Sequence, residues 1–406
     1  MQVSFMKSSI NLLSTALRII VASACLVGIF DSVRLAAGDV LFRRDTEQSI
    51  RSAIRLVPDA PQYYMRLAQL DDTHSKQMLE AALRLNRYNA EENIELALRY
   101  EADGNYSRAE RLLLDAFAVD DTYLPRWSLA NFYLRRDDLP AFWIWAHRAA
   151  EMPADDIGAL FELCWKASSD PDKIASFILT KDPQVIRQYL IFLLTTNRAQ
   201  ISANVASSLI RSGDPNKDRP LILAVVNRLV VEEQPDAAAN VWRALVHQRW
   251  VIQESTVPTN ASFTHEPLPV SFDWTLPSYP GISSVVGPSG LETELSGVEP
   301  EVSTIAEQVL VLSPGSYVFK SVYRTVAIPP ETGIEWQIVD CKSGSVLASS
   351  PDLSSNVLTY ATFSFNVGQD AQLLRLRLLY QRAPGTTRVE GTLKVVSTEI
   401  GAVKAT

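Results

Sequence analysis

The sequence predicts an α + β multidomain protein with an N-terminal membrane helix, an α-helical solenoid and a C-terminal antiparallel β-sandwich. Three observations predict this fold class. An apolar segment lies within the first forty residues, alanines recur 34 residues apart between positions 82 and 150, and alternating apolar and polar residues replace helical periodicity after residue 253. The chain has 406 residues, which is enough for about two or three domains.

The first element is an apolar segment over residues 10–34, preceded by a short tail over residues 1–9. The stretch from Ile10 to Phe30 carries one charge, Arg18, and its length meets the requirement of about 20 residues for crossing a bilayer. We expect an uncleaved single-pass anchor with the bulk of the chain extracytoplasmic (periplasmic). The flanking charges are nearly balanced, so the orientation stays open. A cleaved signal segment and a buried soluble helix are the alternatives.

A repeat of 34 residues follows the apolar segment. Ala82, Ala116 and Ala150 are 34 residues apart, and Asn93 and Trp127 keep the same spacing. This period is typical of stacked helical pairs, in which a small residue allows close approach of the neighbouring helix. Amphipathic segments that begin near Pro or Asp continue beyond the repeats, so we expect about twelve helices stacked as a solenoid over residues 46–251.

Residues 49–153 resemble the tetratricopeptide repeat (TPR) family. The best match covers residues 90–121, where the family's spacing is kept by Leu96, Ala97, Tyr100, Gly104, Tyr106, Ala109, Leu113 and Ala116. The resemblance implies that a protein partner binds the concave face, which the first helix of each repeat lines. The residues expected on that face are Tyr64, Asn93, Arg99, Trp127, Asn131 and Arg135. Packing between repeats is the alternative role for Tyr64 and Trp127.

A β domain over residues 260–400 follows a linker over 252–259 and precedes a tail over 401–406. In the segment 373–382, three leucines alternate with arginines, which is typical of a half-buried antiparallel strand. About eight such strands suggest a β-sandwich, with a loop-rich segment over residues 282–301. The strands are expected at Ser271–Leu276, Leu291–Ser296, Val309–Leu312, Ser316–Thr325, Ile334–Cys341, Val357–Val367, Leu373–Arg382 and Val389–Thr398.

The order of landmarks in the β domain resembles a jelly-roll carbohydrate-binding module. Phe272-Asp273-Trp274 comes early, and the turn Pro314-Gly315 leads into a strand with Tyr317 and Tyr323. The resemblance implies glycan binding, for which aromatic ring faces and planar polar groups are suited. The candidate glycan-binding residues are Trp274, Tyr279, Tyr323, Arg324, Trp336 and Tyr380. A place in the sandwich core is the alternative for Trp274 and Trp336.

The sequence offers no supported catalytic motif. It has no glycine-rich phosphate loop, nucleophile elbow or zinc-protease motif, and its three cysteines and four histidines lack metal-ligand spacing. We therefore expect no enzymatic activity, no cofactor and no metal. A glycan-cleaving enzyme that uses Glu292 and Glu294 is the remaining catalytic alternative. A net charge of −8 argues against nucleic acid as a partner.

The functional hypothesis is a non-enzymatic, membrane-anchored scaffold or assembly protein of the bacterial envelope. Its solenoid would bind a protein partner, and its sandwich would bind a polysaccharide. This arrangement resembles repeat proteins that accompany exopolysaccharide machinery, and the hypothesis rests on that analogy. The alternative is a pure protein–protein interaction adaptor in which the sandwich is a spacer.

Overall fold

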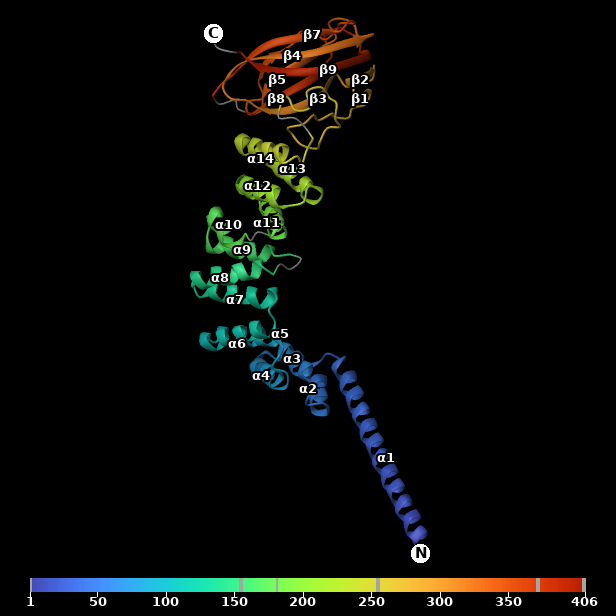
Figure 1. Cartoon of the computed structure of the whole chain (residues 1–406). Coiled ribbons are helices and arrows are strands. Elements are labelled where there is room, and N and C mark those ends of the chain that lie inside the picture. The colour runs from blue at the N-terminus through green and yellow to red at the C-terminus, as the bar shows by residue number, and fades with distance from the viewer. Residues whose placement is uncertain (1, 153–155, 180–181, 253–255, 370–372, 404–406) are drawn as a thin grey trace. The chain divides into compact units, whose positions relative to one another are not determined.

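The computed structural model (Figure 1) describes residues 2–152, 156–179, 182–252, 256–369 and 373–403, without the side chains of 2–17, 19, 20 and 172. The chain forms two compact units, Met1–Asp170 and Pro171–Thr406. The first unit contains helices α1–α9, and the second contains helices α10–α14 together with strands β1–β9. The segment expected to be a linker, residues 252–259, therefore lies inside the second unit.

The first unit is built from antiparallel helical pairs, with α3 against α4, α5 against α6 and α7 against α8 (Figure 1). Its helices are α1 (Gln2–Phe42), α2 (Glu47–Leu56), α3 (Pro61–Leu70), α4 (Ser75–Leu85), α5 (Ala90–Ala102), α6 (Tyr106–Val119), α7 (Tyr123–Arg135), α8 (Leu139–Ala150) and α9 (Gly158–Ala167), with a 3-10 turn η1 (Asp72–His74). Ala82, Ala116 and Ala150 are fully buried. The expectation of stacked helical pairs is therefore confirmed.

Asparagines define where two of the repeat helices begin. The Asn89 side chain accepts a hydrogen bond from the backbone N–H of Glu92, and the Asn105 side chain accepts one from Arg108. Each of these caps satisfies a backbone donor that the first turn of the helix leaves unpaired. Between the two helices, Gly104 takes a φ of +76°, which glycine adopts without strain.

The predicted membrane anchor over residues 10–34 is not supported. No helix in the described part of the chain is long and apolar enough to cross a membrane. The uncharged stretch between Arg18 and Asp31 spans only about 18 Å as a helix, whereas a bilayer core is about 30 Å thick. The side chains of 10–17, and those of the tail before them, lie outside the described residues. The anchor and the extracytoplasmic localisation that followed from it are therefore wrong.

The last turns of α1 instead belong to the core of the first unit. The rings of Phe42 and Tyr63 stack with centroids 4.9 Å apart, and the Tyr63 hydroxyl donates a hydrogen bond to Oδ1 of Asp39 at 3.1 Å. Gly38 permits the close contact with α2, because a Cβ there would lie 2.8 Å from Cγ2 of Val57. The helical unit therefore begins before residue 46, its expected start.

The second unit opens with five helices. They are α10 (Pro171–Ile178), α11 (Pro183–Thr195), α12 (Ser202–Ser212), α13 (Pro215–Val231) and α14 (Pro235–His247), with a 3-10 turn η2 (Ala199–Ile201). Helix α13 begins five residues before the expected start at Pro220, because Asp214 caps it and Pro215 occupies its first position. Asp218 on this helix is fully buried and pairs with Arg187 of α11, whose Nε lies 2.5 Å from Oδ1.

Nine strands form a β-sandwich of two antiparallel sheets. They are β1 (Ile282–Gly287), β2 (Gly290–Ser296), β3 (Val302–Val311), β4 (Gly315–Val326), β5 (Ile334–Asp340), β6 (Val346–Ser349), β7 (Thr359–Val367), β8 (Leu373–Gln381) and β9 (Glu390–Ala402). The sheet orders are β1-β2-β9-β4-β7 and β3-β8-β5-β6. From β3 onward the chain passes repeatedly between the two sheets, as in jelly-roll sandwiches. The expected antiparallel β-sandwich is thus confirmed.

Three details of the sandwich differ from expectation. Residues 282–301 were expected to be loop-rich apart from a strand at Leu291–Ser296, which β2 confirms, but β1 was not expected and pairs with β2 as a hairpin whose last pair is Gly287 with Gly290. Strand β6 was not expected, and it has only four residues. The segment expected as a strand at Ser271–Leu276 forms a single bridge, between Thr275 and Glu307.

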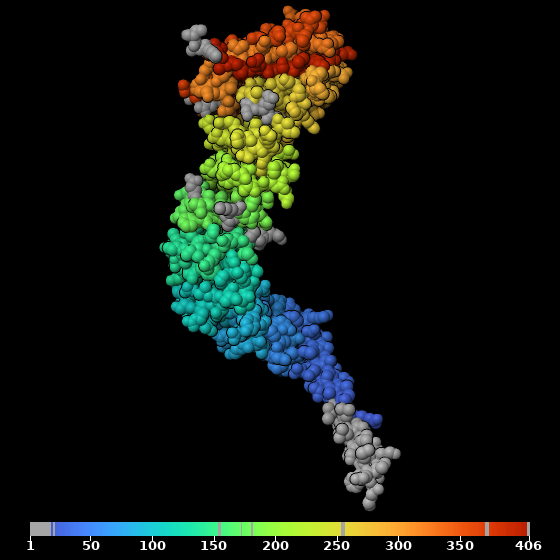
Figure 2. Space-filling model, viewed as in Figure 1, coloured from blue at the N-terminus to red at the C-terminus, as the bar shows by residue number. Residues whose placement is uncertain are grey.

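Helices and sandwich are in direct contact within the second unit (Figures 1 and 2). Asn227 of α13 donates to the carbonyl of Pro269 at 3.0 Å and accepts from the backbone N–H of Ser271 at 2.7 Å. Trp242 of α14 lies with its ring centroid 6.3 Å from that of Phe272. Both rings are buried, so the loop that enters the sandwich is fixed against the helices.

Candidate functional site

The residues expected on the concave face all lie on the first helices of the repeats, α3, α5 and α7. Two of them use their amides within their own helix. The side-chain N–H of Asn93 donates to the carbonyl of Asn89 at 2.8 Å, and that of Asn131 donates to the carbonyl of Trp127 at 3.1 Å. Trp127 is half-buried, and its indole N–H is enclosed without a hydrogen-bond partner among the described residues.

The charged members of this set connect neighbouring repeats. Arg135 forms two hydrogen bonds of 2.7 Å with the carboxylate of Glu101, and Arg99 pairs with Asp72. The Tyr64 hydroxyl donates to the carbonyl of Pro58 at 3.0 Å. The structure therefore places these side chains in contacts between and within repeats.

A groove of about 920 Å³ lies among α4, α5 and α6. Helices α4 and α6 are the second helices of successive pairs, and α5 closes the groove through Asn93 and Leu96. Asn93 is thus the one residue of the predicted set that lines it. The other lining residues are Glu80, Leu83, Arg84, Arg87, Tyr88, Arg108, Leu112, Asp115, Ala118 and Val119.

The groove combines apolar side chains with three exposed arginines and also contains the carboxylates of Glu80 and Asp115. Arg84, Arg87 and Arg108 are exposed, and none of them forms an ion pair with a carboxylate in the described part of the chain. The Glu80 carboxylate instead accepts a hydrogen bond from the Tyr100 hydroxyl, which raises the pKa of that tyrosine. Arg87 and Arg108 lie over the rings of Tyr88 and Tyr100, 5.0 and 5.9 Å from the ring centroids. Guanidinium groups without carboxylate partners suit carboxylate ligands, which they bind in a bidentate geometry.

Four of the predicted glycan-binding aromatics are enclosed by the sandwich. Trp274 is 1% exposed, and Trp336, Tyr380 and Tyr323 are also buried. These four side chains belong to the core that the two sheets enclose, and the indole N–H of Trp274 donates to the carbonyl of Asn260 at 3.1 Å. They therefore offer no ring face to a glycan. Tyr279 is half-buried and Arg324 is exposed.

The outer face of the five-stranded sheet carries an exposed ring that was not among the predicted residues. Tyr360 on β7 is 61% exposed and pairs across the sheet with Val322 of β4. The Nζ atom of Lys320 lies 4.1 Å from the centroid of the Tyr360 ring. Arg324 faces the same side of β4, two residues beyond Val322. Alternation in residues 359–367 could have identified Tyr360, because Ala361, the next residue, points inward.

Glu292 and Glu294, the two glutamates considered for catalysis, are surface residues of β2. Within the described ranges, no group of three or more His, Cys, Asp or Glu side chains could hold a metal ion. Glu292 and Glu294 lie on β2 with exposed side chains, and Glu292 lies 3.7 Å from Nζ of Lys394. Solvent exposure and a neighbouring cation are typical of ordinary surface carboxylates.

No known family model and no curated protein matches the sequence. Similar solved structures include a tetratricopeptide repeat protein from Parabacteroides merdae, with a TM-score of 0.30 and 11% identity, covering 53% of this chain and 94% of that chain. A CBM4 module has a TM-score of 0.27 and 12% identity, covering 36% and 98% of the two chains. A CBM61 module in complex with β-1,4-galactotriose has a TM-score of 0.23 and 10% identity, covering 32% and 88%.

At TM-scores this low, the matches carry no argument about the fold or the ligands of this chain. The fold assignment rests on the helical pairs and the two sheets themselves. The chain combines helical repeats similar to TPR proteins with a β-sandwich similar to carbohydrate-binding modules.

Proposed function

We propose that the protein is a non-enzymatic scaffold whose helical repeats bind an acidic segment of a partner protein in the groove between α4 and α6. The observation that carries this proposal is the set of three exposed arginines, Arg84, Arg87 and Arg108, without carboxylate partners. They surround an apolar floor formed by side chains such as Leu83 and Leu112.

Charge and shape together favour this kind of ligand. The whole chain has a net charge of −8, so it repels long polyanions at a distance, while the groove attracts carboxylates locally. Leucine and valine side chains in the floor can receive apolar residues of the ligand, as in helix-in-groove recognition. An amphipathic acidic segment satisfies both the arginines and the floor, and charge complementarity of this kind sets specificity and association rate.

The test uses the full chain and a library of fluorescein-labelled 15-residue peptides that combine Asp or Glu with Leu at helical spacing. We expect saturable binding, which weakens as salt is raised because exposed charges are screened over about 10 Å at 0.1 M. The double variant Arg84→Glu with Arg87→Glu should lose about a hundredfold in affinity, a factor of ten for each contact.

The matched control reverses the same number of charges outside the groove. Arg43→Glu with Arg55→Glu changes two exposed arginines that do not line it, and we expect this variant to bind as tightly as the original chain. Equal losses in both double variants would mean that only net charge matters. That result, or a library without any binder, would overturn the proposal.

A second candidate function, glycan binding by the sandwich, is favoured by one observation. Tyr360 presents an exposed ring on an open sheet face beside Lys320 and Arg324. The Lys320 ammonium lies over this ring, so a sugar would take its place on the ring face. The C–H groups of the sugar would then pack on the ring while its hydroxyls accept hydrogen bonds from the neighbouring donors.

A glycan array that includes bacterial exopolysaccharides, probed with the full chain, tests this second function. Tyr360→Ala should abolish the retained signal, whereas Val285→Ala should preserve it. Val285 is 64% exposed on β1, in the same sheet as Tyr360. A blank array from well-folded protein, or a signal that survives Tyr360→Ala, would remove this candidate.

A further inference from the structure

The outer edge of strand β3 is only partly covered. β3 is an edge strand of the four-stranded sheet. Thr275 and Glu307 exchange backbone hydrogen bonds of 2.7 and 2.9 Å, and the N–H of Val309 donates to the carbonyl of Ser271 at 2.8 Å. The backbone groups of Glu307 and Val309 therefore point away from β8, toward the edge.

The same alternation directs the backbone N–H and C=O of Val311 to this edge, because the backbone groups of every second residue in a strand point to the same side. No residue that the structure describes forms a hydrogen bond with either group. Val311 lines a pocket of about 400 Å³ at the point where the coverage by residues 271–275 has ended. An unpaired strand edge of this kind is a template for a further strand.

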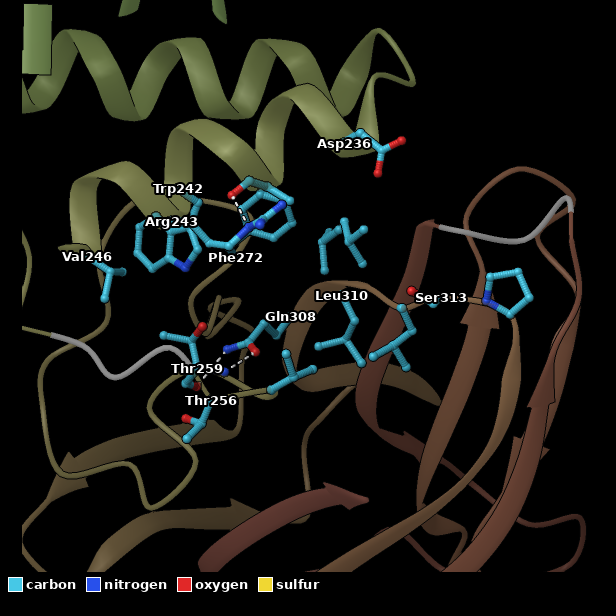
Figure 3. Close-up of a pocket in the computed structure, with 16 residues that line it drawn as sticks. Asp236, Trp242, Arg243, Val246, Thr256, Thr259, Phe272, Gln308, Leu310 and Ser313 are labelled. Atoms are coloured by element: carbon cyan, nitrogen blue, oxygen red, sulfur yellow. Dashed lines mark hydrogen bonds between the residues drawn. The ribbon is translucent and has the colours of Figure 1, made fainter. Parts of the chain in front are cut away.

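Helix α14 forms the opposite wall of the pocket (Figure 3). Trp242 and Val246 of the helix lie on the side of the pocket opposite Leu310 and Ser313, and Ala239 also lines it. Other contacts hold the walls in place. The side chain of Gln308 makes two hydrogen bonds, of 2.8 and 2.9 Å, with the backbone of Thr259. The pocket is therefore a slot between a strand edge and a helix face that carries Ala239, Trp242 and Val246 together with the charged Asp236 and Arg243.

We propose that this slot binds an extended peptide segment of a partner protein, which adds to β3 as a short strand and directs an apolar side chain at α14. The edge that continues beyond the paired N–H of Val309, as far as Ser313, spans about 13 Å, the length of about four extended residues. The added strand continues the pairing that residues 271–275 begin. Asp236 and Arg243 on α14 carry opposite charges, so the slot favours an uncharged segment.

The test probes the full chain with labelled pentapeptides in which Val, Ile, Phe or Trp alternates with Ser. We expect at least one sequence to bind with a Kd below about 1 mM. Val311→Pro removes the outward N–H without removing a bond to β8, and it should weaken binding by about tenfold, as expected for one hydrogen bond. Val311→Thr keeps the N–H and should bind normally.

A second pair of variants acts from the helix side, in case the proline variant does not fold. Ala239→Trp fills the slot and should abolish binding. Ala237→Trp changes a half-buried residue of the same helix that does not line the slot, and it should leave binding intact.

N-methylation of the best peptide separates strand addition from binding by side chains alone. Methyl groups on the amides that face β3 should abolish binding, and methyl groups on the intervening amides should not, because only alternate amides face the edge. A library without a binder, equal effects of both methylation patterns, or binding that survives Ala239→Trp would each overturn the proposal. The groove on α4 and α6 is unaffected by these outcomes, since its ligand is acidic and its variants lie in the first unit.

Discussion

Glu92 provides the sharpest test of the energetics of the repeats. It lies in the first turn of α5 and is only 1% exposed. Its Oε1 accepts a hydrogen bond from the Asn89 side chain at 3.0 Å, while Oε2 is enclosed without a partner among the described residues. Burial penalises the carboxylate form and raises the pKa of Glu92 to about 7, although the bond from Asn89 acts in the opposite direction.

The sign of the pH effect follows from this direction. A carboxyl whose pKa is higher in the folded chain than in the unfolded chain binds more protons when folded, so stability falls as pH rises. The fall runs between about pH 4.5, the ordinary value, and about pH 7. At about 1.4 kcal/mol per unit of pKa, the burial of the charged form costs up to about 3 kcal/mol at pH 8.

Glu92→Gln replaces the carboxyl with a neutral group of the same shape that can still accept from Asn89. We expect the variant to be more stable than the original chain by up to about 3 kcal/mol at pH 8 and nearly equal to it at pH 4. Urea unfolding followed by circular dichroism gives the difference. Hydrogen exchange of peptides from α5 assigns the change to this helix.

The matched control is Glu91→Gln, at the exposed neighbouring position in the same helical turn. This substitution removes a favourable interaction with the helix dipole and should destabilise by about 0.5 kcal/mol at pH 8, opposite in sign to the effect at Glu92. If Glu92→Gln destabilised the chain at pH 8, or changed its stability equally at both pH values, the reasoning from burial would be refuted.

Two further predictions concern packing and a buried ion pair. Gly38→Ala should lower the stability of the first unit by about 1 to 3 kcal/mol, because the added methyl group overpacks the contact with Val57. Gly28→Ala, at a position with open space around it, should instead stabilise the helix by up to about 1 kcal/mol. Thermal unfolding measures both changes, and equal shifts in melting temperature would contradict the packing of α1 against α2. Asp218→Asn should lower the free energy of unfolding by about 3 kcal/mol, because it leaves the Arg187 guanidinium without its buried carboxylate partner. If urea unfolding gave the same loss of stability for Asp218→Asn as for the exposed Asp236→Asn, that role of the ion pair would be contradicted.

The helical pairs were predictable because their signal is local and repeated. Ala82, Ala116 and Ala150 mark positions where only a small side chain fits between helices, and all three are fully buried. The sandwich was predictable for a similar reason, since Leu374, Leu376 and Leu378 alternate into the core. Because the same pattern recurs at several positions, a wrong assignment at one residue does not change the predicted fold.

The role of α1 could not be read from composition. An apolar run in the first forty residues is compatible with an anchor, a signal segment or a packed helix. The distinguishing contacts, from Gly38 to Val57 and from Phe42 to Tyr63, join residues that the repeat pattern does not relate. Strand β1 was missed because its serines and glycine lack the apolar alternation by which strands are recognised, whereas β2 corresponds to the strand expected at Leu291–Ser296.

The candidate sites show a stricter limit of sequence reasoning. Trp274 and Tyr360 are both aromatic residues of the β domain, yet one is 1% exposed and the other 61% exposed. For Tyr360, which was not predicted, the alternation with Ala361 would have been enough to predict exposure, because its strand has one face toward the core. For the groove, no local sequence pattern predicts which arginines lack a carboxylate partner. Arg84 lies four residues after Glu80, a spacing that suggests an ion pair on one helix, but the Glu80 carboxylate is engaged by Tyr100 of the next helix. Arg84 is available for a partner because a tertiary contact engages the carboxylate that would otherwise pair with it, and sequence spacing alone cannot show such a contact.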